Sequence, residues 1–198
     1  MIHPRTINQA IYLKKLLTMR KPITVAVGPP GSGKTLLACH VATQQLLTNK
    51  VEKIVITRPL VSVDEEIGFL PGKLEQKMAP WIKPMFEIFE KEKVHKSVEI
   101  VPIGFMRGRT FKNSFIIADE MQNSTKSQMK MILTRLGEES KMVIAGDIDQ
   151  SDICPHTNGL SDLISKISNT ELEYIDHILF NDDDVQRHKA IREILKLY

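Results

Sequence analysis

One stretch of this 198-residue chain constrains its fold more than any other: Gly28-Pro29-Pro30-Gly31-Ser32-Gly33-Lys34-Thr35 matches the pattern G-x-x-x-x-G-K-[ST] at every fixed position. The apolar residues 23–27 before it predict a buried strand, and residues 36–47 after it predict a helix, which is the order that the motif requires. Backbone N–H groups of such a loop surround a phosphate chain, while the lysine reaches the β- and γ-phosphates and the threonine hydroxyl binds Mg²⁺. We therefore expect all eight residues to hold a nucleotide, with Lys34 also acting in catalysis.

Two carboxylates supply the second half of the expected site. The apolar residues 115–118 predict a buried strand that ends in Asp119-Glu120. A carboxylate at the tip of such a strand holds Mg²⁺ through its water shell, and the next one orients an attacking water. Acidic residues are also common in turns, but their pairing with the phosphate loop favours Asp119 as a metal ligand and Glu120 as a catalytic residue.

A third polar segment follows the strand predicted over residues 141–145. It reads Gly146-Asp147-Ile148-Asp149-Gln150. A polar side chain at this position is placed to sense the γ-phosphate, and Gln150 or Asp147 fits the role; we assign Gln150 as the catalytic candidate.

Strands and helices alternate from residue 23 to residue 145, with further strands predicted over 53–57, 98–102 and 172–180. This order predicts an α/β fold, a three-layer RecA-like P-loop NTPase with a mostly parallel central sheet. The length suits one domain, residues 1–198, with a helical insert at about 60–96. In the insert we expect two short helices, 73–78 and 81–91, separated by prolines. Its aromatic residues Trp81, Phe86 and Phe89 predict packing more than a base-stacking platform.

An amphipathic helix is predicted over residues 6–19, with Ala10, Leu13 and Leu17 on its inner face. Gln9 lies near its start. In many nucleotide-dependent motor proteins a glutamine upstream of the phosphate loop recognises adenine, and Gln9 is a candidate for that role. An ordinary surface glutamine explains it equally well. After residue 124, the spacing predicts a helix over 125–136 that ends at Gly137, and further helices over 158–168 and at the C-terminus.

Composition indicates the expected cellular location of the chain and the classes of partner it can bind. No apolar run approaches the roughly 20 residues of a membrane span, and residues 1–5 lack a secretory apolar region, so we expect a cytoplasmic protein with no membrane partner. Cys39 and Cys154 have no metal or redox spacing, and we expect both in or near the core. A net charge of +3 permits nucleic-acid binding without arguing for it.

Clustered basic residues indicate where RNA or single-stranded DNA would bind. Arg58 follows a predicted strand, and Arg107 and Arg109 flank a glycine in a compact loop. Lys73 and Lys77 lie in the insert. Contacts from such residues are directed at phosphates and tolerate any sequence. A solvated basic turn is the alternative for the loop at 107–109.

In this order the motifs resemble the PhoH-like family of P-loop ATPases, which is related to the core of superfamily 1 helicases. The resemblance implies ATP binding, Mg²⁺-dependent hydrolysis, a cytoplasmic setting and a link to RNA metabolism or phosphate starvation. Met121 departs from the family, which usually has alanine there. Some relatives carry an appended nuclease or RNA-binding domain, so we expect any action on nucleic acid to come from this domain or from a partner. Beyond the phosphate loop, the matching stretches are Thr57-Arg58-Pro59, Gly68-Phe69-Leu70-Pro71-Gly72, Met106-Arg107-Gly108-Arg109-Thr110, Asp119-Glu120-Met121-Gln122-Asn123, Gln128-Met129-Lys130, Leu133-Thr134-Arg135-Leu136-Gly137, Gly146-Asp147-Ile148-Asp149-Gln150 and Arg187-His188.

The resemblance also bears on assembly. Superfamily 1 enzymes bind nucleotide between two domains, and the second domain donates an arginine to the transition state. Because one domain fits here, we expect a neighbouring copy to donate Arg135 or Arg187 within a homo-oligomeric ring, most simply a hexamer. Two other functions remain open: a nucleotide-gated binding module with negligible turnover, and a small-molecule kinase. The Asp119-Glu120 pair and the segment 146–150 favour hydrolysis.

Overall fold

A twisted, all-parallel sheet forms the centre of the protein. The structure, a computed structural model, describes residues 3–59, 74–187 and 190, and only the backbone of residues 74–81. Within these residues six strands pair in the order β3-β2-β4-β5-β1-β6, and every pairing is parallel. The predicted sheet is thereby confirmed. The strands are β1 (Ile23–Val27), β2 (Lys53–Thr57), β3 (Val98–Ile100), β4 (Ser114–Ala118), β5 (Lys141–Gly146) and β6 (Ile175–Leu179).

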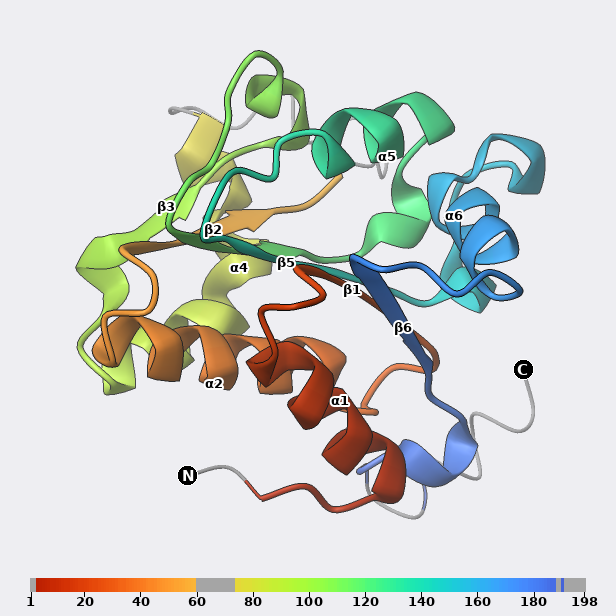
Figure 1. Cartoon of the computed structure of the whole chain (residues 1–198), viewed down its shortest axis with the longest axis horizontal. Coiled ribbons are helices and arrows are strands. Elements are labelled where there is room, and N and C mark those ends of the chain that lie inside the picture. The colour runs from red at the N-terminus through yellow and green to blue at the C-terminus, as the bar shows by residue number, and fades with distance from the viewer. Residues whose placement is uncertain (1–2, 60–73, 188–189, 191–198) are drawn as a thin grey trace.

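Helices cover both faces of the sheet, which gives the predicted three layers (Figure 1). On one face lie α1 (Ile7–Leu17), α2 (Lys34–Leu47) and α4 (Leu74–Lys91). On the other lie α5 (Lys126–Leu133) and α6 (Gly159–Ile167). Short 3₁₀ turns are η1 (His95–Ser97), η2 (Ile103–Met106), η3 (Met121–Asn123), η4 (Ile148–Gln150), η5 (Pro155–Thr157) and η6 (Asp182–Asp184).

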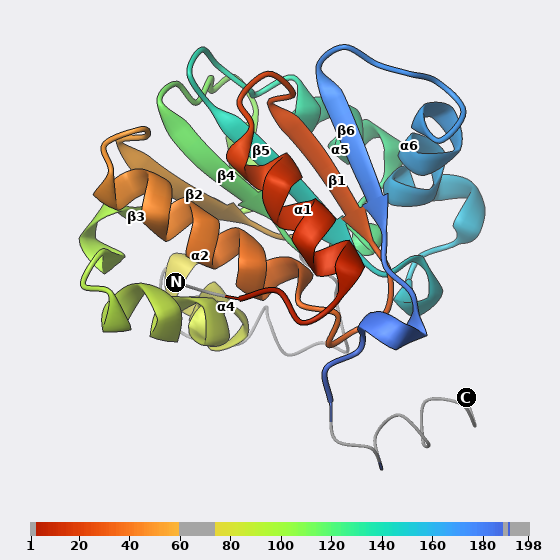
Figure 2. The ribbon, with the colours of Figure 1, turned by 60° about the horizontal axis from the view of Figure 1, so that its bottom comes forward.

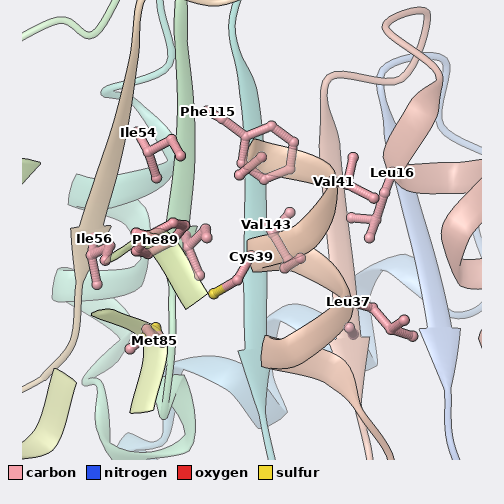
Figure 3. Packing of buried hydrophobic residues seen from close by; sticks show 14 of the residues in the cluster. Leu16, Leu37, Cys39, Val41, Ile54, Ile56, Met85, Phe89, Phe115 and Val143 are labelled. Atoms are coloured by element: carbon pink, nitrogen blue, oxygen red, sulfur yellow. The ribbon is translucent and has the colours of Figure 1, made fainter. Parts of the chain in front are cut away.

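Burial explains why the central strands read as continuous apolar runs. Every residue of β1, β4 and β5 is buried, because both faces of these strands pack against helices. Figure 3 shows the core between the sheet and the α2 side, where Cys39 of α2 lies close to Phe89 of α4 and Val143 of β5. The packing prediction for Phe89 is confirmed, since it is fully buried and meets Phe86 edge-to-face.

Residues 74–91 form one helix, so the prediction of two short helices is wrong. Proline inside a helix removes a hydrogen bond and usually kinks or ends it. Here Ile82, Met85 and Phe89 are buried in the core, and this packing holds the helix together through Pro84, which faces solvent. The remaining part of the expected insert, residues 60–73, lies outside the described residues, and with it the stretch 68–72.

Three smaller expectations are also corrected. Helix α1 buries Gln9, Tyr12 and Leu16, a face rotated by about one residue from the predicted one, and Leu17 is 47% exposed. Helix α5 ends at Leu133, before Gly137, which instead allows close approach to the Phe111 carbonyl. Cys154 is exposed, whereas Cys39 is buried as expected.

The parallel arrangement brings the carboxyl ends of all six strands to one edge of the sheet (Figure 2). Residues that follow these ends therefore meet, although they are far apart in sequence. Among the described residues, no helix is long and apolar enough to cross a membrane.

Candidate active site

A cavity of about 760 Å³ opens at this edge of the sheet. The phosphate loop, the ends of β4 and β5, and the start and end of the described chain all contribute to it. Its walls include most of the expected nucleotide and catalytic residues. They are Gln9, Pro30, Gly31, Gly33, Lys34, Thr35, Asp119, Glu120, Asp147, Gln150 and Arg187, with His3, Arg5, Leu36, Leu37, Gly146 and Gln186.

The phosphate loop has the backbone that its glycines predict. Gly33 has a φ of 91° and is the N-cap of α2, so the free N–H groups at the start of that helix face the loop. Gly28 has a φ of 145°, and a Cβ there would lie 2.5 Å from the Phe180 carbonyl oxygen. A side chain at position 28 would therefore separate the loop from the chain that follows β6.

Lys34 projects its ammonium into the loop. It donates hydrogen bonds to the carbonyls of Gly28 (2.6 Å) and Pro29 (2.9 Å). Burial lowers the pKa of Lys34, while nearby carboxylates, Asp147 first among them, act to raise it. The ammonium is thus held among carbonyl oxygens, which a phosphate oxygen can replace as hydrogen-bond acceptor.

Thr35 and Asp119 meet across 84 residues of sequence, because the Thr35 hydroxyl donates to Asp119 Oδ1 at 2.8 Å. Burial raises the pKa of Asp119, and the negative charge of Glu120 raises it further. A hydroxyl beside a carboxylate on a phosphate-binding cavity suits Mg²⁺, which takes few protein ligands and fills its shell with waters and phosphate oxygens. The described residues contain no cluster of three or more His, Cys, Asp or Glu side chains arranged for a metal.

Glu120 is held by Gln122, a contact that the sequence analysis missed. Glu120 has a left-handed backbone, with φ 54°. The Gln122 amide donates to Glu120 Oε2 at 2.6 Å, and its oxygen accepts from the Asp147 N–H at 3.0 Å. Gln122 is 1% exposed, so it ties the end of β4 to the end of β5 inside the protein. The only signal in the sequence was its place in the D-E-x-Q-N stretch.

Both candidates for sensing the γ-phosphate line the cavity. Asp147 is 7% exposed, and burial raises its pKa. Gln150 ends the short turn η4 and is exposed. The structure brings both side chains to the site and leaves the choice between them open.

Gln9 is not a surface residue, so that alternative is wrong. It is 5% exposed, donates to the Ser32 carbonyl at 2.9 Å and accepts from the Arg5 N–H at 2.8 Å. Gln9 therefore braces the phosphate loop from α1. Its role in adenine recognition stays a prediction.

The two candidate arginines lie in different places. Arg187 lines the cavity of its own chain. Arg135 donates to the carbonyls of Met131 (3.1 Å) and Arg109 (3.0 Å), and it is absent from the cavity wall. Donation of either arginine by a neighbouring copy stays a prediction. Association of copies stays a prediction.

The expected nucleic-acid residues are only partly brought together. Arg58 lines a second pocket of about 480 Å³, which shares Glu120 and Gln150 with the main cavity. Arg107 is exposed, whereas Arg109 pairs with Glu99 and lies over the Phe111 ring at 4.5 Å. Lys73 and the Lys77 side chain lie outside the described residues.

Comparisons with known proteins identify a matching family and similar folds. A sequence model of the family described as PhoH-like protein matches residues 1–198. A PhoH-like protein of Synechocystis is 38% identical over the whole chain, which spans 62% of that relative's length. The large terminase of a thermophilic bacteriophage has a similar fold, with a TM-score of 0.63 at 12% identity over 98% of this chain and 50% of that one. The Pif1 helicase of Candida albicans has a TM-score of 0.50 at 15% identity over 100% of this chain and 43% of that one. At these low identities, the two structural similarities show a shared fold and nothing more.

Proposed function

The chain belongs to the PhoH-like protein family, and from this premise we propose that it is an ATPase that binds ATP with Mg²⁺ and hydrolyses the β–γ phosphoanhydride. The observation that carries the proposal is the 2.8 Å hydrogen bond from Thr35 to Asp119 on the wall of a cavity that also contains Lys34 and Glu120. A phosphate loop, a metal-suited oxygen pair and a second carboxylate are the parts that phosphoryl transfer to water requires.

In the proposed reaction the loop N–H groups of residues 28–35 hold the phosphate chain, and the Lys34 ammonium moves from loop carbonyls to phosphate oxygens. Mg²⁺, held by Thr35 and Asp119, would supply charge neutralisation for the phosphates. Glu120 orients a water for in-line attack on the γ-phosphorus. The new P–O bond forms as the bond to the bridging oxygen breaks, ADP takes the electron pair, and the proton of the water passes toward Glu120. Gln150 or Asp147 senses the γ-phosphate.

We further propose that turnover is coupled to RNA or single-stranded DNA in the cytoplasm. A helicase and a phage terminase share the fold, and Arg58 lies beside Glu120 in the smaller pocket. Arg107 is exposed and Arg58 is half-buried at the smaller pocket, and both are candidates to contact phosphates, with Lys73 and Lys77 as further candidates. Arg109 pairs with Glu99. Salt should weaken binding, because such contacts release counterions.

A phosphate-release assay tests the proposal, with ATP and Mg²⁺ in the presence and absence of single-stranded RNA or DNA. Lys34→Ala should abolish binding or turnover, while the exposed control Lys50→Ala should not. Tight ATP binding without phosphate release would favour the binding module. Turnover only with an added acceptor would favour a kinase. RNA or DNA binding that does not fall with salt would contradict the coupling.

A further inference from the structure

The chain that follows β6 crosses the phosphate loop, and we call residues 180–187 the C-terminal arm. Phe180 donates its N–H to the Val27 carbonyl at 2.7 Å, and Gln186 donates its N–H to the Gly31 carbonyl at 2.9 Å. Figure 2 shows the first part of the arm beside the start of α1 and near the loop that joins β1 to α2. The arm is therefore attached to the end of β1 at its start and to the phosphate loop near its end.

The Arg187 side chain lies against Gly31 of the phosphate loop. A Cβ built on Gly31 would lie 2.8 Å from Arg187 Nε and 2.9 Å from its Cγ. Arg187 also lines the cavity with Lys34 and Glu120.

The arm is fixed to the N-terminal helix through Asp184, which is 2% exposed. Its carboxylate accepts hydrogen bonds from the Thr6 hydroxyl, from Asn8 Nδ2 at 2.8 Å and from the Asn181 N–H at 3.0 Å. Tyr12 of α1 meets Phe180 edge-to-face at 5.5 Å. Helix α1 also braces the loop through Gln9. Arm, helix and loop thus form one connected unit around the site.

We propose that Arg187 is a catalytic residue that acts in cis, on the γ-phosphate side of a nucleotide bound by its own chain, and that Asp184 is its positioning residue. The inference rests on the ATPase function proposed above. A guanidinium donates several hydrogen bonds in a fixed fork and matches phosphate oxygens well. It would neutralise the charge on the γ-phosphate and on the bridging oxygen as that bond breaks, an effect worth about 10³- to 10⁵-fold where arginines act in this way.

The test compares Arg187→Ala, Arg187→Lys and the exposed control Arg20→Ala in the full chain. We expect Arg187→Ala to lower kcat at least about 100-fold with a smaller change in KM, Arg187→Lys to restore part of it, and Arg20→Ala to match the wild type. Asp184→Asn should lower kcat about 10-fold with the fold retained. Unchanged kcat in Arg187→Ala would overturn the inference while leaving the ATPase proposal intact.

Two further readouts keep the inference testable. Arg187→Ala should lower the ratio of ATP to ADP affinity about 10-fold, which requires no turnover; an unchanged ratio would overturn a contact on the γ-phosphate side. Mixing Lys34→Ala chains with Arg187→Ala chains separates cis from trans. Action in cis predicts that the mixture stays inactive, because no chain carries both residues, whereas restored activity would show donation from a neighbouring copy.

Discussion

Gln122 connects Glu120, the carboxylate proposed to orient the attacking water, to Asp147, which follows β5. One buried amide bonds both Glu120 and the Asp147 N–H. We expect Gln122→Ala to lower kcat about 10- to 100-fold, because Glu120 loses the partner that orients it. The variant should also lose stability, since the Asp147 N–H is left without its acceptor.

Steady-state kinetics at saturating ATP, together with thermal unfolding, check the Gln122 prediction. Gln44→Ala on the exposed face of α2 is the matched control and should behave as the wild type. A Gln122→Ala protein that unfolds at a lower temperature yet keeps the wild-type kcat would show that the amide is structural only.

At the scale of elements, Asn158 joins α6 to the active-site turns. Its Oδ1 accepts from the N–H groups of Leu160 and Ser161, and its Nδ2 donates to the Gln122 carbonyl at 2.8 Å. Asn158→Ala removes a helix cap and a buried hydrogen bond together, so we expect a loss of about 2–3 kcal/mol in the free energy of unfolding.

Denaturant titration measures the Asn158 effect, with the exposed Asn169→Ala as control. Asn158→Asp keeps the helix cap but loses the side-chain N–H donor. Its free energy of unfolding should therefore lie between those of Asn158→Ala and Asn169→Ala. A loss in Asn158→Ala no larger than in Asn169→Ala would contradict the role given to this residue.

We expect the attachment of the C-terminal arm to α1 to depend on pH through Asp184, which accepts hydrogen bonds from Thr6 and Asn8. Burial acts to raise the pKa of Asp184, but hydrogen bonds from Asn8, Thr6 and Asn181 outweigh it, and the pKa lies below its usual value. A carboxyl with a lower pKa in the folded state stabilises the protein above its unfolded pKa of about 3.9, and this contribution is lost as the pH falls through the folded pKa.

The wild type should therefore exceed Asp184→Asn in unfolding free energy at pH 7, and the difference should shrink below about pH 4. Denaturant titrations of both proteins across this range measure it. A difference that stays constant down to about pH 2.5, below the usual range of a carboxyl pKa, would contradict the prediction.

Elements could be predicted from sequence where local pattern decides them. The strand before the phosphate loop and the strand before Asp119 are mostly apolar and buried on both faces, so their residue types and their order were enough to predict both strands. The single helix over residues 74–91 could not be predicted in this way, because the tertiary packing of Phe89 outweighs the local effect of proline. The contacts of Gln122 and Asp184 could not be predicted from the sequence either, because folding brings their partners together from distant parts of the chain.

At the scale of the whole molecule, five segments distant in sequence build one site: α1, the phosphate loop, the ends of β4 and β5, and the C-terminal arm. The parallel sheet aligns the strand ends, and the arm brings Arg187 to the same cavity. On this account a single chain supplies the loop, the metal-suited pair, the carboxylate and the arginine. A ring of copies remains a prediction, and the inferred cis action of Arg187 does not require it.

Glu120→Gln is the decisive variant for ATP hydrolysis at this site with Glu120 acting on the water. Bound ATP and released phosphate are measured in the same samples for wild type and variant. We expect ATP affinity within a few-fold of wild type and phosphate release slower by about 100-fold or more, because only the group that acts on the water is removed. Near-normal phosphate release by Glu120→Gln would contradict this expectation.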